Sequence, residues 1–67
     1  MPTIQLNGEA RQMPEATSVA ALLADAGYGD RRVAVEINRE IVPKSLYRER
    51  LLCEGDRVEI VHALGGG

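Results

Sequence analysis

The chain has 67 residues, enough for one small domain, and only Tyr28 and Tyr47 are aromatic. Its core must therefore be aliphatic, and a domain of this size has little room for a deep enclosed active site. The net charge of -2 and the interleaving of basic with acidic residues disfavour a nucleic-acid partner.

The cysteine count and the start of the chain indicate the compartment. Cys53 is the only cysteine, so no internal disulfide can form. Residues 1–4 lack the basic and apolar regions of a signal peptide, and no apolar run is long enough for a transmembrane helix. We therefore expect a soluble protein of a reducing cytosol, with no membrane partner.

The chain begins with a predicted hairpin. Residues 3–6 alternate polar and apolar side chains, which is typical of a half-buried strand. Asn7-Gly8 follows, and both residues accept the positive φ of a type I′ turn. Residues 9–13 predict a weaker returning strand, and Pro14 ends the ladder because it lacks an N–H group.

A single helix is predicted over roughly residues 18–26. Thr17 or Ser18 is a suitable N-cap, and Glu15 is placed to favour the positive end of the helix dipole. Gly27 supplies the C-cap. One apolar stripe, which must lie on a sheet, is formed by Val19, Leu22, Leu23 and Ala26.

Two short strands follow the helix. Residues 33–37 place three aliphatic side chains on one face, which predicts a strand with that face inward. Asn38-Arg39 is a plausible two-residue turn, residues 40–42 form a short fourth strand, and Pro43 ends it.

The segment of residues 44–52 is ambiguous. Leu46 and Tyr47 are its expected apolar anchors, with room for a single 3₁₀ turn before Leu51-Leu52. A tight turn is predicted at Glu54-Gly55-Asp56.

Residues 57–63 form the last predicted strand. Val58 and Ile60 should face the core, so Val61 and Ala63 should face away from it. Exposed apolar side chains on a sheet face can mark a docking patch.

Three consecutive glycines end the sequence. Glycine has no side chain to pack and loses conformational entropy on folding, so a compact domain gains no stability from this ending. We predict a domain over residues 1–63 and a flexible tail over residues 64–67 that reaches about 10 Å. No Cβ obstructs the carboxylate of Gly67, which is a candidate reactive group. The alternative is an ordinary disordered terminus.

The order strand, strand, helix, strand, strand, strand resembles that of the β-grasp, or ubiquitin-like, fold. We therefore predict an α+β domain in which a mixed sheet of four to five strands packs on one helix. The resemblance implies that the first and last strands lie parallel at the centre of the sheet, joined by a long crossover.

A β-grasp pattern with a glycine tail resembles two groups, the ubiquitin-like modifiers and the bacterial sulfur carriers. Among the carriers the chain looks like the ThiS type of thiamine biosynthesis, over its whole length. The most specific part is AVEINREIVPKS at residues 34–45. The remaining support comes from Asn7-Gly8, Thr17-Ser18-Val19, Glu54-Gly55-Asp56 and the terminal glycines.

The resemblance implies a carrier that acts as a co-substrate and not as an enzyme, with no catalytic residue, metal or bound cofactor of its own. An E1-like adenylyltransferase of the ThiF type would use ATP and Mg²⁺ to activate the carboxylate of Gly67. A sulfur donor, such as a cysteine desulfurase relay, would convert it to a thiocarboxylate. The acceptor would be a thiazole synthase of the ThiG type.

The resemblance also assigns roles to residues around the tail. Gly65 and Gly66 would enter partner active sites because they are slender and flexible. Val61 and Ala63 would dock the partner, and Leu64 is either a docking contact or the last core contact. We expect the free protein to be a monomer.

Other functions stay open. The chain could be a protein modifier that forms isopeptide bonds through Gly67, the related carrier for molybdopterin synthase, or a purely structural β-grasp module. Cys53 is more simply an incidental residue than a second sulfur site. His62 is more simply a solvated or partly packed side chain than a group that orients the carboxylate.

Overall fold

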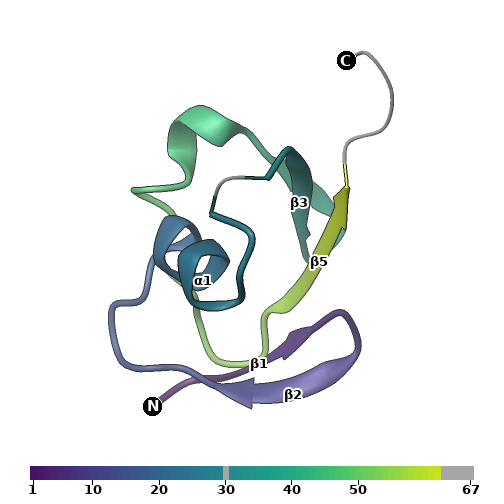
Figure 1. The fold of residues 1–67 in the computed structure, drawn as a ribbon. Helices are drawn as coiled ribbons and strands as arrows, with labels where there is room; N and C mark the ends of the chain where they lie inside the picture. Colours follow the sequence, from purple (N-terminus) through teal and green to yellow (C-terminus); the bar gives the residue numbers. More distant parts are fainter. Residues whose placement is uncertain (30, 63–67) are drawn as a thin grey trace.

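One helix lies across one face of a five-stranded mixed sheet (Figure 1). The computed structural model describes residues 1–29 and 31–62. Within them the chain forms β1 (Thr3–Leu6), β2 (Glu9–Gln12), α1 (Val19–Asp25), β3 (Val33–Ile37), β4 (Glu40–Val42), a 3₁₀ turn η1 (Lys44–Leu46) and β5 (Arg57–His62). The predicted α+β architecture, with one helix on the sheet, is confirmed.

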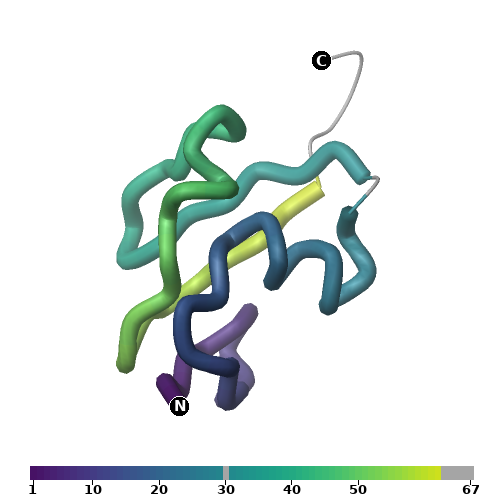
Figure 2. Tube along the Cα trace, turned by 90° about the vertical axis from the view of Figure 1, so that its left-hand side faces the viewer, coloured from purple at the N-terminus to yellow at the C-terminus, as the bar shows by residue number. Residues whose placement is uncertain are grey.

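The strands lie in the order β2-β1-β5-β3-β4. β1 runs parallel to β5, and the pairing is short, with Gln5 opposite Arg57 and Leu6 opposite Val58. The predicted parallel pair of first and last strands is therefore confirmed, and α1 lies in the long crossover between them (Figure 2). On its other side β5 pairs antiparallel with the whole of β3.

Both predicted two-residue turns form. Asn7 and Gly8 have φ values of 50° and 88°, and Asn38 and Arg39 have φ values of 53° and 70°. All four residues therefore occupy the left-handed region that a type I′ turn requires. Asparagine adopts this conformation more readily than most residues, whereas Arg39 is held there by the pairing of β3 with β4.

The helix starts at a serine cap. The Oγ of Ser18 accepts a hydrogen bond from the Ala21 N–H at 3.1 Å, so Ser18 is the N-cap and α1 is one residue shorter at each end than predicted. The hydroxyl of Thr17 donates instead to the carbonyl of Pro14. The prediction for Glu15 is wrong, because the first turn holds no acidic residue and the Glu15 carboxylate lies 3.0 Å from the N-terminal ammonium of Met1.

The helix ends at Asp25, and Gly27, which follows the C-cap residue Ala26, has a φ of 89°. Its N–H donates to the carbonyl of Ala24, and the N–H of Tyr28 donates to the carbonyl of Leu23. These two bonds make a Schellman motif, in which glycine provides the left-handed residue just beyond the helix.

The core lies between α1 and the inner face of the sheet. Three of the four residues of the predicted helix stripe are buried, whereas the fourth, Ala26, is half-buried. The inward residues of β3 and β5 are also buried, except that Val33 is only partly buried against the core. Its members are Ile4, Met13, Val19, Leu22, Leu23, Val35, Ile37, Val42, Leu52, Val58 and Ile60.

The segment of residues 44–52 contributes to the core through Leu52 and the predicted anchor Tyr47, but not through the predicted anchor Leu46. Leu46 is 43% exposed and does not anchor the segment, because it lies in the single turn η1 with its side chain turned to solvent. Leu52 is buried instead, and the N–H of Leu52 donates to the carbonyl of Thr17. Tyr47 is half-buried against the core, and this burial raises the pKa of its phenol.

A buried carboxylate organises the loop before β5. Asp56 is 5% exposed, and its Oδ2 accepts hydrogen bonds from the N–H of Cys53 at 2.8 Å and from Nη2 of Arg50 at 3.3 Å. Its Oδ1 accepts a hydrogen bond from Nδ2 of Asn38 at 3.1 Å. The predicted turn at residues 54–56 is thus tied to the turn between β3 and β4.

We expect Asp56→Ala to lower the free energy of unfolding by about 2–3 kcal/mol, because it leaves three donors without their acceptor. Urea unfolding followed by far-UV circular dichroism measures this. The matched control is Asp25→Ala, which removes an exposed ion pair with Arg11 at 2.9 Å and should change the same free energy by less than about 1 kcal/mol. Equal losses in the two variants would contradict the assignment.

Candidate functional site

β5 leads the chain toward its C-terminal residues. It ends at His62, and the residues that carry the tail prediction follow it: Ala63, Leu64, Gly65, Gly66 and Gly67. They lie outside the described residues, as does the predicted boundary between domain and tail. The strand that precedes them is described in full, and it is the starting point for the site.

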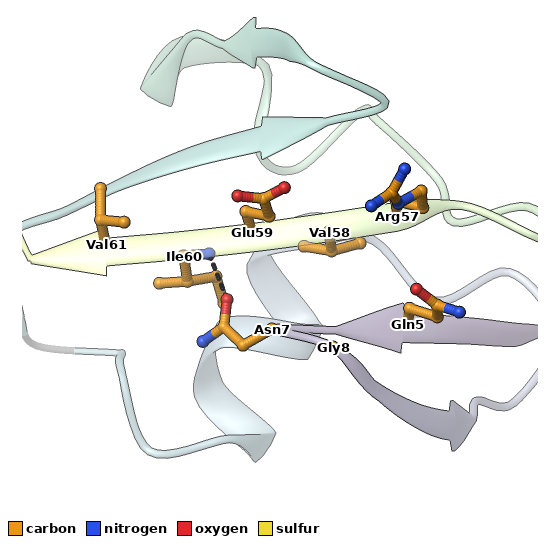
Figure 3. A pocket seen from close by; sticks show the side chains of 8 residues that line it. All are labelled: Gln5, Asn7, Gly8, Arg57, Val58, Glu59, Ile60 and Val61. Atoms are coloured by element: carbon orange, nitrogen blue, oxygen red, sulfur yellow. Dashed lines mark hydrogen bonds between the residues drawn. The ribbon is translucent and has the colours of Figure 1, made fainter.

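Two asparagine side chains hold the backbone of β5. The N–H of Asn7 donates to the carbonyl of Val58, and its Oδ1 accepts from the N–H of Ile60 at 2.8 Å (Figure 3). At the start of the strand, the N–H of Asn38 donates to the carbonyl of Arg57, and its Oδ1 accepts from the N–H of the same residue at 3.0 Å. The amide of Asn7 thereby replaces a main-chain carbonyl where β1 leaves the sheet.

The side chains of β5 alternate as predicted. Val58 and Ile60 are 1% and 6% exposed and point into the core, whereas Arg57, Glu59 and Val61 are exposed. Val61 is 58% exposed and therefore faces away from the core, which confirms the predicted orientation for this residue.

A shallow hollow lies beside this strand. It has a volume of about 460 Å³ and is lined by Gln5, by the Asn7-Gly8 turn and by β5 from Arg57 to Val61 (Figure 3). It exists because β1 turns away after Leu6 while β5 continues to His62. Beyond Ile60, β5 pairs in the sheet with β3 alone, down to the pair of His62 with Val33.

The two other residues considered for sulfur chemistry lie in ordinary surroundings. His62 is exposed, and its ring lies 5.8 Å from the ring of Tyr28 at an interplanar angle of 55°. Cys53 is exposed in the loop before β5, so the length of that strand, roughly 17 Å, separates it from His62. Cys53 is thus not placed beside the residues that lead into the tail.

Two further features bear on the kind of site. Among residues 1–29 and 31–62, no three side chains of His, Cys, Asp or Glu are grouped so that they could hold a metal ion. None of the helices in that part of the chain is long and apolar enough to cross a membrane.

Comparison with known proteins identifies the family. A model of the ThiS family matches residues 4–67, which include all of the fold except the first residue of β1, and the terminal glycines. The chain belongs to the ThiS family. The predicted family resemblance is therefore confirmed.

Individual relatives agree with this family. The sulfur carrier protein ThiS of Bacillus subtilis is 40% identical over 65 residues, which cover 96% of this chain and 98% of the relative. A thiazole synthase of Paramagnetospirillum magneticum is 48% identical over 62 residues, or 92% of this chain. The chain spans only 19% of the length of that thiazole synthase.

The solved structure of a thiamine biosynthesis protein (ThiS) from Geobacter metallireducens has the same fold. Its TM-score to this chain is 0.83 at 26% sequence identity, and the similarity covers 97% of this chain and 99% of that one. The β-grasp fold that the sequence predicts is therefore confirmed.

We expect the two asparagines to protect different amides of β5. In Asn7→Ala, the hydrogen-exchange rate of the Ile60 N–H should increase relative to the wild type by about tenfold more than the rates of the other β5 amides, because this N–H loses its acceptor. In Asn38→Ala the same effect should appear at the Arg57 N–H. NMR-detected exchange measures both. Equal acceleration of both amides in both variants would show global destabilisation and contradict the local assignment.

Proposed function

We propose that the chain carries sulfur as a thiocarboxylate on Gly67. The supporting observation is the family match, which runs through residue 67, together with the likeness to a sulfur carrier over nearly the full length of both chains. The roles proposed for the tail residues rest on this family membership.

The chemistry requires activation by a partner. A carboxylate is ionised near neutral pH, and its charge and resonance make its carbon a poor electrophile. In the proposed first step, a Gly67 carboxylate oxygen attacks the α-phosphate of ATP, which forms an acyl-adenylate and releases pyrophosphate. Sulfur at the oxidation level of sulfide then attacks the carbonyl carbon and displaces AMP, which leaves the thiocarboxylate.

In this proposal the chain is a co-substrate. An E1-like adenylating enzyme supplies the site for ATP and Mg²⁺. Where the donor is a cysteine desulfurase relay, the terminal sulfur of its persulfide displaces AMP and forms an acyl disulfide. A thiol reductant then cleaves the S–S bond, which releases the thiocarboxylate and leaves the thiol oxidised in a disulfide with the donor cysteine. The folded domain identifies the carrier to its partners, and Gly65 and Gly66 let the C-terminus enter a narrow channel because they carry no Cβ.

A thiazole synthase is the proposed acceptor. Support comes from the thiazole synthases of Paramagnetospirillum magneticum and Magnetococcus marinus, each of which resembles this chain over about a fifth of its length. A segment like this carrier is thus part of those synthase chains, which favours a thiazole synthase over molybdopterin synthase or a conjugation target.

The docking surface is proposed at the outer face of β5. Val61 is an exposed aliphatic side chain directly before His62 and the tail. Ala63 and Leu64 would extend the same contact. Partner binding here would hold the end of β5 beside the partner, and the slender tail would then reach the partner's active site.

The decisive experiment is intact-protein mass spectrometry after incubation with the adenylating enzyme, ATP and a sulfur donor. We expect a mass gain equal to the exchange of one oxygen for one sulfur, on the C-terminal peptide. A chain that lacks Gly66 and Gly67 is the control and should show no gain. Conjugate ladders on a gel would favour a protein modifier instead, and no gain with active control proteins would contradict the proposal.

We also expect Gly66→Val to fold normally but to be adenylated about 10- to 100-fold less efficiently in kcat/KM. A β-branched side chain widens and stiffens the tail, so the carboxylate is misplaced relative to ATP. Pyrophosphate release measures the rate, and an unchanged melting temperature shows that the domain is intact. Full activity of this variant would remove the steric role of the tail glycines.

A further inference from the structure

The outer face of the sheet carries a pair of facing carboxylates. Glu36 on β3 lies directly opposite Glu59 on β5 in the antiparallel register, and on its other side Glu36 lies opposite Ile41 of β4. One step nearer the tail, Ala34 lies opposite Val61. All five side chains share the face that points away from α1, because side chains alternate along a strand and each of the five adjoins a buried residue. These buried neighbours are Val35, Ile37, Val42, Val58 and Ile60.

The acidic pair is flanked by exposed aliphatic side chains. Ile41 is 64% exposed and Val61 is 58% exposed. Large exposed aliphatic residues on both sides of a charged pair are typical of a docking surface, in which the apolar flanks exclude water and strengthen the central electrostatic contact. The hollow lined by Glu59 and Val61 borders the same surface (Figure 3).

The isolated domain gains nothing from this arrangement. Residues directly opposite in an antiparallel pair have Cβ atoms about 5 Å apart, and like charges at that position are destabilising. None of the ion pairs formed within residues 1–29 and 31–62 includes Glu36 or Glu59. Arg57 shares the outer face, two residues before Glu59, but forms no ion pair with it.

We propose that the adenylating enzyme places an arginine or lysine side chain between Glu36 and Glu59 when it binds this carrier, with apolar contacts to Ile41 and Val61. This inference rests on the proposed function and names the chemistry of its docking partner. Two carboxylates cannot be covered by an apolar surface without a large desolvation penalty, whereas a guanidinium can bond both. A second copy of the chain is a poor occupant, because self-docking on this face would bring two acidic pairs together.

The position of the pair relative to the tail supports this partner. Glu59 lies three residues before His62 on the strand that leads to the tail, and that strand is fixed by Asn7 and by its full pairing with β3. A cation bound at Glu59 would therefore set the distance between the docked surface and His62, the last residue of β5 before the proposed tail. The contact would act as a specificity determinant, since a partner without a cation is rejected by the two carboxylates.

The test compares Glu36→Gln, Glu59→Gln and the double variant with Glu9→Gln and Glu49→Gln, which remove the same charge elsewhere. Binding of the adenylating enzyme is titrated by calorimetry without ATP, and thiocarboxylation is followed by mass spectrometry. We expect Kd and KM to rise about tenfold for each face variant, with kcat unchanged at saturation and a weaker dependence of Kd on salt. The two controls should stay within about twofold of the wild type.

A stability measurement separates docking from folding. Because the facing charges repel, Glu59→Gln should raise the melting temperature by about 1–5 °C while it weakens binding. Unchanged Kd in both face variants, equal losses in the controls, or wild-type dimers that the face variants disrupt would overturn the inference. Tight, glutamate-dependent binding without any thiocarboxylation would instead refute the proposed function and leave the docking inference standing.

Discussion

The structure depends on the way two turn asparagines hold β5. Asn7 and Asn38 both adopt left-handed backbone conformations, and each uses its main chain and its side chain to bond the same strand. The side-chain amide supplies an acceptor where a neighbouring strand has already turned away. The two hairpin turns thereby fix the position of β5, the strand that leads toward the C-terminus. The short parallel pairing of β5 with β1 would hold it less firmly by itself.

This anchoring decides which side chains the strand offers to a partner. A strand has a side-chain period of two, so a shift of register by one residue would bury Glu59 and expose Ile60. Ile60 is fixed inward by its burial and by the bond from its N–H to Asn7. Because Ile60 is fixed inward, its neighbours Glu59 and Val61 must point outward. The proposed docking face therefore follows from the same contacts that stabilise the fold.

Much of the fold could be predicted because its signals are local. Asn7-Gly8, the stripe of α1 and the alternation in β3 and β5 each involve residues close together in the sequence. The structure confirms the turn, the alternation and the stripe except for Ala26, which is half-buried. The failures involve contacts between distant segments. Leu46 is exposed and does not anchor its segment, whereas Leu52 is buried and its N–H donates to the distant carbonyl of Thr17. Glu15 pairs with the N-terminal ammonium of Met1 instead of the helix end. The side chain of Asn7 accepts a hydrogen bond from the N–H of Ile60, 53 residues away, and no rule of local sequence spacing predicts such a contact. The parallel pairing of the first and last strands was predicted from the family resemblance and not from the residues themselves. The position of Glu36 opposite Glu59 could not be predicted, because it depends on the register between β3 and β5.

The same architecture limits stability and provides the interaction surface. One helix can cover only one face of a five-stranded sheet, so a domain of this kind buries a thin aliphatic core and leaves the other face to solvent. Ile41 and Val61 are exposed on either side of two carboxylates whose facing charges oppose folding slightly. Such a face would suit the proposed carrier function, because charge pairing at a small exposed surface gives selective association without permanent burial.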